Sequence, residues 1–368
     1  MKKLQSLLQA DLQGKRVLVR FDLNVPIGDD GVVHDEDADR IRKSLPTLEY
    51  LKNAGAKVII IAHIGRDPKE TLKPVANYMN IPLFPLKDFS VAELDNNQVV
   101  ILENLRSTPE EESNDPAFSA LLAAYAELYV NDAFSVSHRA HASVVGVAQL
   151  LPAYAGLQLE QEIENLDRAL HPEHPALLIM GGAKFETKLP VIQKLLPLVD
   201  VVFIGGALVN NFYKEKGYEV GKSLLDPEAH LGDLVNNSKI IISDQVVVQN
   251  DGENDIGGPA KFAQQISPAD RIVDVVIPEL LIQKINESKT IIWNGPMGNY
   301  ENGFSTGTES LTRIIAASGT YSIIGGGDSV ALIEKLGLEK SFGFLSTGGG
   351  AMLEYLVQGT LPGIEALK

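Results

Sequence analysis

The sequence predicts an α/β protein made of two Rossmann-like parallel-sheet domains that are joined by a helical hinge. Short runs rich in Val and Ile alternate with longer amphipathic segments along the whole chain, which is typical of doubly wound α/β architecture. The short runs lack alternation of apolar and polar residues, as expected for parallel strands that are covered on both faces. A length of 368 residues also favours two domains over a single core.

Ten segments are predicted to be strands, four in the first half and six in the second. They are Val17–Val25, Val58–His63, Val99–Leu102, Leu128–Asn131, Ala176–Met180, Val201–Ile204, Ile240–Val248, Thr290–Trp293, Tyr321–Ile324 and Phe344–Leu345. Amphipathic segments such as Arg40–Ala54 and Pro116–Leu128 lie between them and predict helices. The second of these helices has Asp115 at a plausible N-cap and Pro116 at its first position.

A helix over residues 156–170 is predicted to connect the two domains. Its apolar residues at 159, 163, 166, 169 and 170 follow helical spacing, and the prolines at 172 and 175 end it. This places an N-terminal domain over residues 1–155 and a C-terminal domain over 171–354. Such a connecting helix holds two lobes at a defined distance and confines bending to its ends.

Composition excludes several classes of function. The formal net charge of −16 argues against non-specific binding to nucleic acid or to an anionic membrane surface. With no cysteine, the chain has no disulfide, thiolate metal site or cysteine nucleophile. The N-terminus lacks the apolar region and cleavage site of a signal peptide, and no apolar run approaches the length of a membrane span. We therefore expect a cytoplasmic protein, and a monomer.

In the first half, cationic side chains follow the ends of the predicted strands. They are Arg20, His63, Arg66, Arg106, Arg139 and His141. Open α/β sheets bind ligands at the carboxyl ends of their strands, and clustered arginines bind small anions through forked, charged donors. Taken alone, the segment Arg20–Pro26 fits a structural strand end equally well. Several such strand ends in one half favour a site for an anionic metabolite.

In the second half, glycine-rich turns follow the strands instead. They are Gly181–Gly182, Gly205–Gly206, Gly325–Gly327 and Gly348–Gly350, and no Gly-Gly pair precedes residue 181. Turns of this kind between a strand and a helix let backbone amides approach phosphates closely. The second half therefore predicts a nucleotide site, so that the two halves together suit a two-substrate phosphoryl-transfer enzyme.

Three charged residues beside these turns have competing interpretations. Lys184 and Lys188 share a helix face, where either they bind an anion between them or both are solvated surface lysines. Asp328 follows Gly325–Gly327 and is either a simple N-cap or, beside a bound phosphate, the ligand of a divalent cation.

Two further motifs do not meet their requirements. Gly217–Ser223 resembles a P-loop, but only three residues separate its glycines where four are needed. No segment fits the G-x-G-x-x-G/A fingerprint of dinucleotide-binding domains, which argues against a dehydrogenase. No spacing of residues is typical of a zinc site either.

The motifs RFDLNVP, HIGR, LENLR, DAF, HRAH, GGAK, WNGPMG, GGGDS and STGGGA occur in this order and together resemble the phosphoglycerate kinase family. The resemblance covers residues 17 to about 363. It implies two Rossmann-like domains and reversible phosphoryl transfer from 1,3-bisphosphoglycerate to ADP, giving 3-phosphoglycerate and ATP with Mg²⁺, as in glycolysis and gluconeogenesis. It also implies that residues from about 355 to 368 return to pack on the N-terminal domain.

The resemblance assigns roles residue by residue. The phosphoglycerate is expected to contact Asp22, Leu23, Asn24, Arg40, His63, Ile64, Gly65, Arg66, Arg106 and Arg139. The nucleotide is expected to contact Lys188, Glu301, Gly326, Gly327, Asp328 and Ser329, with Glu301 at the ribose and Asp328 at the metal. The transferring phosphoryl group is expected to lie among Arg40, Lys184, Lys188, Gly327 and Gly350.

Several features depart from the family pattern or leave an alternative open. The chain is short for the family around residues 66–100 and 223–250, Ser135 and Ser329 replace a usual glycine and a common threonine, and Asp255–Pro259 has an extra glycine. None of these changes removes a charged group needed for the chemistry. A non-catalytic relative would be expected to lack the arginine cluster, Lys184, Lys188 or Asp328, all of which are present. For Arg40, pairing with the carboxylates of the acidic stretch 34–39 is the competing explanation.

Overall fold

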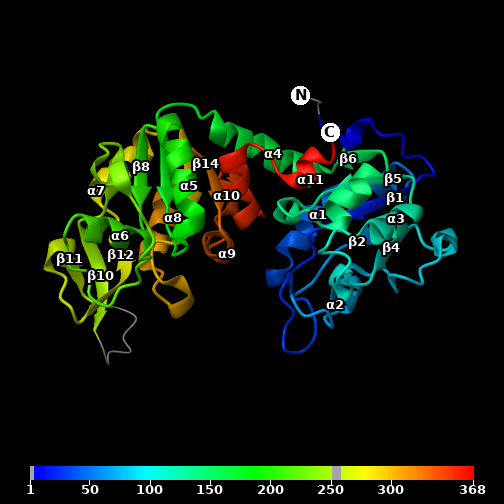
Figure 1. The fold of residues 1–368 in the computed structure, drawn as a ribbon, viewed down its shortest axis with the longest axis horizontal. Coiled ribbons are helices and arrows are strands. Elements are labelled where there is room, and N and C mark those ends of the chain that lie inside the picture. The colour runs from blue at the N-terminus through cyan, green and yellow to red at the C-terminus, as the bar shows by residue number, and fades with distance from the viewer. Residues whose placement is uncertain (1–3, 251–257) are drawn as a thin grey trace. The chain divides into compact units, whose positions relative to one another are not determined.

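The computed structural model describes residues 4–250 and 258–368, and the chain forms two compact units (Figure 1). One comprises Met1–Glu164 with Thr360–Lys368, and the other comprises Asn165–Gly359. Each contains a parallel sheet with helices, so the predicted fold class is confirmed. The division falls inside helix α4 (Leu157–Leu170), and the hinge role of this helix stays a prediction.

The N-terminal unit has a six-stranded parallel sheet of order β3-β4-β2-β1-β5-β6. The strands are β1 Arg16–Arg20, β2 Lys57–Ile61, β3 Leu83–Phe84, β4 Val99–Leu102, β5 Leu128–Asn131 and β6 Ala153–Ala155. The apolar residues of β1 and β2 are fully buried, as the non-alternating pattern predicted. Strands β3 and β6 were not predicted, because runs of two or three residues give no periodic signal.

Helices α1 (Asp39–Asn53), α2 (Lys73–Met79), α3 (Pro116–Ala124) and α11 (Pro362–Glu365) belong to the same unit. The predicted start of α3 is confirmed, because the Asp115 side chain accepts a hydrogen bond from the Phe118 amide at 2.9 Å and Pro116 is the first helical residue. Its predicted end at Leu128 is wrong, because Leu128 is already the first residue of β5.

The chain returns to this unit at its C-terminus. Thr360–Lys368 group with the N-terminal unit, and the Gly363 amide donates a hydrogen bond to the Ser137 carbonyl at 2.8 Å. A Cβ at Gly363 would lie 2.6 Å from a Val144 methyl group, so a larger residue does not fit without displacement. The residues of α10 up to Gly359, by contrast, belong to the C-terminal unit.

The C-terminal unit has a six-stranded parallel sheet of order β15-β14-β13-β7-β8-β9. The strands are β7 Ala176–Met180, β8 Val201–Ile204, β9 Ile240–Ile242, β13 Thr290–Asn294, β14 Tyr321–Gly325 and β15 Phe344–Leu345. The helices are α5 Phe185–Leu195, α6 Leu208–Glu215, α7 Glu279–Glu287, α8 Thr306–Ser318, α9 Gly327–Lys335 and α10 Gly349–Gln358. Helices α5, α9 and α10 begin just after strands β7, β14 and β15, so their amino ends face the edge where ligands bind in such sheets.

A second, antiparallel sheet of this unit was not predicted. It consists of β10 (Gln245–Asn250) between β11 (Ala260–Phe262) and β12 (Asp270–Val275). The predicted single strand Ile240–Val248 is therefore wrong, because the chain leaves the parallel sheet after Ile242. The Ser243 hydroxyl lies within hydrogen-bond distance of the carbonyls of Gln245 and Val276, at 2.8 and 2.7 Å, and stabilises this break.

Among the described residues, no helix combines the length and the apolar character needed to cross a bilayer.

Candidate active site

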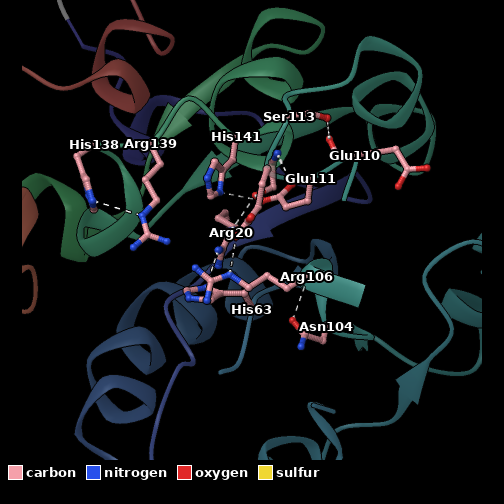
Figure 2. Close-up of polar contacts among 12 residues, drawn as sticks. Arg20, His63, Asn104, Arg106, Glu110, Glu111, Ser113, His138, Arg139 and His141 are labelled. Carbon is pink, nitrogen blue, oxygen red and sulfur yellow. Dashed lines mark hydrogen bonds and ion pairs between the residues drawn. The ribbon is translucent and has the colours of Figure 1, made fainter. Parts of the chain in front are cut away.

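The cationic residues of the N-terminal unit gather at the carboxyl edge of its sheet (Figure 2). Arg20 ends β1, His63 follows β2, Arg106 follows β4, and Arg139 with His141 follows β5. Figure 2 shows these side chains, which come from separate strand ends, arranged around Arg20. The parallel sheet thus brings together residues that are far apart in the sequence.

Arg20 is the most deeply buried arginine of this cluster, with only 1% of its surface exposed. Its Nε donates to the Ser143 hydroxyl at 3.0 Å, and its other donors reach the Phe21 carbonyl and Nδ1 of His63. Ser143 in turn donates its hydroxyl and its amide to Glu111, at 2.6 and 3.0 Å. Burial raises the pKa of Glu111 and lowers that of Arg20, and the attraction between the two charges opposes both shifts. Arg20 therefore has a structural role in the cluster, because its donors hold Ser143 and His63 in place.

Arg40 reaches the cluster from the first turn of α1. Its Nη1 donates to the Asp22 carboxylate at 2.7 Å, and the same carboxylate accepts a hydrogen bond from the Ser135 hydroxyl. The neighbouring Arg42 and Lys43 are the residues that pair with Asp39, at 3.9 and 2.7 Å. Local pairing with the acidic stretch is therefore wrong as the explanation for Arg40.

The other predicted phosphoglycerate residues adopt different environments. Leu23 and Ile64 are buried, and the amide and carbonyl of Ile64 are both hydrogen-bonded to the Asn104 side chain, at 3.2 and 3.0 Å. The Asn24 side chain accepts a hydrogen bond from the Gly65 amide at 2.8 Å, and Arg106 donates to the Gly65 carbonyl. These contacts join the loops that follow β1, β2 and β4.

The remaining arginines of the cluster are less enclosed. Arg106 also pairs with Glu112 at 3.2 Å, and Arg139 Nε lies 3.3 Å from the His138 ring. Arg66 is exposed. Exposed or half-buried guanidinium groups above a buried Arg20 leave donors that an anion can engage.

The C-terminal unit contains a cavity of about 740 Å³ beside its glycine-rich turns. The predicted residues that line this cavity are Lys184, Lys188, Glu301, Gly326, Gly327, Asp328 and Gly350. Lys184 lies between β7 and α5, Lys188 lies in α5, Glu301 lies between β13 and α8, and the other residues lie at the amino ends of α9 and α10. Ser329 does not line it: this residue is fully buried in the first turn of α9, and its hydroxyl has no hydrogen-bond partner among the described residues.

Lys188 lies in a cage of glycine backbone. Its ammonium group donates to the Gly181 carbonyl, and a Cβ at Gly182 or Gly295 would lie 2.5 or 2.3 Å from its Nζ. Burial lowers the pKa of Lys188 to about 8, with Asp328 opposing and Lys184 adding to the shift. The interpretation of both lysines as solvated surface residues is wrong for Lys188, whereas Lys184 is exposed.

Asp328 occupies the first turn of α9, one residue after the helix begins. The N-cap is Gly326, with a φ of 99°, and within the described part of the chain no side-chain capping hydrogen bond is formed at this end. The interpretation of Asp328 as a simple N-cap is therefore wrong. Its carboxylate instead borders the cavity beside the glycine turn and Lys188.

Comparisons with known proteins agree with this geometry. The family model described as phosphoglycerate kinase matches residues 7–359. The chain belongs to the phosphoglycerate kinase family. Curated relatives of that name from Thermosynechococcus vestitus and Dictyoglomus turgidum are each 42% identical, covering 100% of this chain in both cases and 98% and 99% of their own lengths.

Solved structures of the family have the same fold. The phosphoglycerate kinase of Coxiella burnetii superposes with a TM-score of 0.85 at 33% identity, covering 99% of each chain. That of Pyrococcus horikoshii gives a TM-score of 0.85 at 30% identity, covering 99% of this chain and 98% of its own. As a member of the phosphoglycerate kinase family the chain is a nucleotide-using phosphotransferase, and a non-catalytic relative is not favoured.

The phosphoglycerate kinase family generally uses Mg²⁺, and the cavity fits a metal that arrives with a nucleotide. Among the described residues, no group of three or more His, Asp or Glu side chains could hold a metal by itself. Four carboxylates of the described residues line the cavity, and one of them, Asp328, belongs to the glycine turn after β14. Mg²⁺ is commonly held by one or two carboxylates together with substrate phosphates, so this arrangement suits it.

Sequence reasoning missed several residues of this cavity. Asp274 and Arg271 come from β12, a strand of the unpredicted antiparallel sheet. Asn294 also lines the cavity; it belongs to the motif WNGPMG, but the sequence alone assigned it no role. The extra-glycine segment lies outside the described residues at positions 255–257.

His63 provides a pH-dependent test of the cluster. Burial, followed by the positive charges of Arg20, Arg106, Arg139 and Arg40, lowers the pKa of His63 to about 2. We therefore expect its ring resonances to show no titration between pH 5 and 8 in the ligand-free protein, with a His63→Gln spectrum for assignment. A midpoint near 6.5 would show that the four arginines do not surround this ring as described.

The same shift has a consequence for stability. Unfolded His63 binds a proton below pH 6.5 and folded His63 does not, so its contribution to stability falls as pH falls, by about 1.4 kcal/mol per unit. The difference in stability between wild type and His63→Gln should change with that sign between pH 6 and 5. A pH-independent difference would contradict it.

Proposed function

We propose that the C-terminal unit binds ATP or ADP in the glycine-lined cavity and that the cationic cluster of the N-terminal unit binds 3-phosphoglycerate or 1,3-bisphosphoglycerate. The observation that supports this best is the environment of Lys188, a lysine buried among glycine backbone next to Asp328. Such a buried cation lacks a full counter-charge until an anion arrives, so phosphate binding is strongly favoured there.

In this proposal the nucleotide phosphates lie at the amino ends of α9 and α10. Backbone amides and the helix dipole favour negative charge at these ends. Lys188 and Lys184 would contact the phosphates, and Glu301 would accept hydrogen bonds from the ribose hydroxyls. Mg²⁺, held by Asp328 when the nucleotide is bound, would neutralise phosphate charge.

At the cationic cluster, Arg66, Arg106 and Arg139 supply donors for the phosphate and carboxylate of the phosphoglycerate. Arg20 keeps its hydrogen bonds to Ser143 and His63 and so holds these two residues in position. Because Arg20 donates to its Nδ1, the neutral His63 ring carries its proton on Nε2 and can donate one hydrogen bond there without adding charge. Arg40, which is partly exposed and held by Asp22, retains donors for the phosphoryl group.

The chemistry requires alignment and charge stabilisation. In the direction of ATP synthesis, an oxygen of the ADP β-phosphate attacks the phosphorus of the acyl phosphate, the bond from phosphorus to the acyl oxygen breaks, and a carboxylate leaves. No general base is needed, because the nucleophile is already an anion. The protein residues hold the reactants in line and offset the charge on the transferring oxygens.

A coupled assay with 3-phosphoglycerate and Mg-ATP tests the proposed function. We expect ADP to form only when both substrates are present, and Lys188→Ala to lose most of this activity while its fold is retained. Glu186→Ala, on the exposed face of the same helix, is the control. A folded protein that binds both ligands without turnover would restore the non-catalytic alternative.

The Arg40 assignment predicts a loss in kcat. A cation that contacts a phosphoryl group in flight contributes on the order of 10³–10⁵ in rate, so Arg40→Ala should lower kcat by roughly 10³-fold. Arg40→Lys should recover only part, because an ammonium lacks the planar fork of donors. Loss of this partner from the buried Asp22, which keeps its hydrogen bond from Ser135, should cost about 1–3 kcal/mol of stability.

Steady-state kinetics and thermal melts of these variants decide the matter. Arg42→Ala is the matched control, because Arg42 lies on the same helix but pairs with Asp39 and contacts the Asp35 carbonyl. A folded Arg40→Ala enzyme with kcat within a few-fold of wild type would remove Arg40 from the transition state.

The Asp328 assignment predicts a metal-specific loss of affinity. Asp328→Asn should weaken binding of Mg-ADP by at least about tenfold, the loss common when even indirect metal partners are removed. Its melting temperature should stay nearly unchanged, because no side-chain capping bond is lost at this helix end. Calorimetry with Mg-ADP and with ADP in EDTA separates the two effects. Equal losses under both conditions would mean that Asp328 does not serve the metal.

A further inference from the structure

The loop between β13 and α8 presents Glu301 to the cavity, and its geometry depends on one buried carboxylate. We propose that Asp274 is a positioning residue of the nucleotide site, which fixes this loop and thereby the Glu301 carboxylate. The inference rests on the proposed nucleotide site and concerns how that site is held.

The first contact fixes the end of the loop where α8 begins. Asp274 is 3% exposed, and its Oδ2 accepts a hydrogen bond from the Gly307 amide, in the first turn of α8, at 2.8 Å. Ser305, the N-cap residue of this helix, makes no side-chain capping bond. A carboxylate from another strand therefore takes the position that a capping side chain normally fills, where the helix dipole also favours negative charge.

The same carboxyl group packs against the other arm of the loop, which backbone hydrogen bonds hold beside it. A Cβ at Gly298 would lie 2.5 Å from Asp274 Cγ, so only glycine allows this approach. The next residue, Asn299, donates its amide to the carbonyl of Val273 at 2.7 Å, and Met297 donates its amide to the Thr308 hydroxyl at 2.9 Å. Both arms of the loop are thus attached at β12, and Glu301 lies between the attachments in a short 3₁₀ turn.

A buried carboxylate is a costly way to join two backbone segments. Burial raises the pKa of Asp274 to about 6, although the amides of Gly307 and Val275 both donate to it. An apolar residue would avoid this cost if core stability alone were at stake. The carboxylate, however, gives the loop a directional anchor that an apolar side chain lacks.

Asp270 on the same strand provides a contrast. It is also buried, but its carboxylate pairs with Lys261 at 2.8 Å and accepts from the Ser267 amide at 2.8 Å. These partners lie outside the Glu301 loop, and Asp270 is not among the residues that line the cavity. Asp270→Asn is therefore a matched control for loss of a buried carboxylate from β12.

Calorimetry with ADP in the absence of phosphoglycerate measures the effect directly. We expect Asp274→Ala to weaken ADP binding by about tenfold, which corresponds to the loss of one helix cap. Asp274→Asn should weaken it less, because its amide oxygen can still accept from Gly307. In steady-state kinetics the KM for ATP should rise while the KM for 3-phosphoglycerate stays within about twofold, and Asp270→Asn should change neither.

A double-mutant cycle with Glu301→Ala tests the route of the effect. If Asp274 acts by positioning Glu301, the double variant should bind ADP no more weakly than Glu301→Ala alone. Additive losses, or equal losses in Asp274 and Asp270 variants, would reduce Asp274 to a general stability role. Should Asp274→Ala not fold, the same cycle with Asp274→Asn decides. Failure of the wild type to bind ADP would instead contradict the proposed nucleotide site itself.

Discussion

The parallel pairing of buried strands is the constraint on which both candidate sites depend. The interiors of the parallel strands are largely buried and almost entirely apolar, with Ser322 of β14 as an exception, and polar groups are placed mainly at or after the strand ends. All strands of a parallel sheet end at the same edge, so residues from distant parts of the chain meet there. In the N-terminal unit this edge collects arginines and histidines, and in the C-terminal unit it collects glycine turns, two lysines and an aspartate.

The carboxyl edge of the N-terminal sheet holds more positive charge than its immediate partners neutralise, in a chain whose net charge is −16. Arg20 is connected through Ser143 to Glu111, and Arg40 pairs with Asp22, but Arg66 is exposed. Burial, followed by the charges of four arginines, lowers the pKa of His63. In the other unit, burial is likewise the main reason that the Lys188 pKa falls, and Lys184 adds to the shift. Each site thus contains a group whose positive form is disfavoured first by burial and then by neighbouring cations, and a bound anion would offset both effects.

The sequence was sufficient for features whose signal is local. Buried strands of four or five residues, the Asp115 cap and the glycine turns each follow from a few neighbouring residues. Features that depend on distant partners could not be read in this way. The Ser143–Glu111 contact, the pairing of Arg40 with Asp22 and the antiparallel sheet that contains Asp274 join segments with no common pattern. The single apolar stretch after residue 240 was interpreted as one strand because only the tertiary contacts of Ser243 reveal the break.

Close approach to phosphate is one reason why glycine occupies these positions of the C-terminal unit, and the buried charged side chains provide a second. Gly182 and Gly295 both have positive φ, at 81° and 89°, and both lie against the Lys188 ammonium, so any side chain there would meet a strained backbone and displace the amine. Gly298 and Gly307 similarly admit the Asp274 carboxyl group. The glycine pattern therefore makes room for two buried charged groups as well as for a ligand. A sequence pattern that indicates nucleotide binding is, in this structure, also the condition under which Lys188 and Asp274 can reach the positions from which they act.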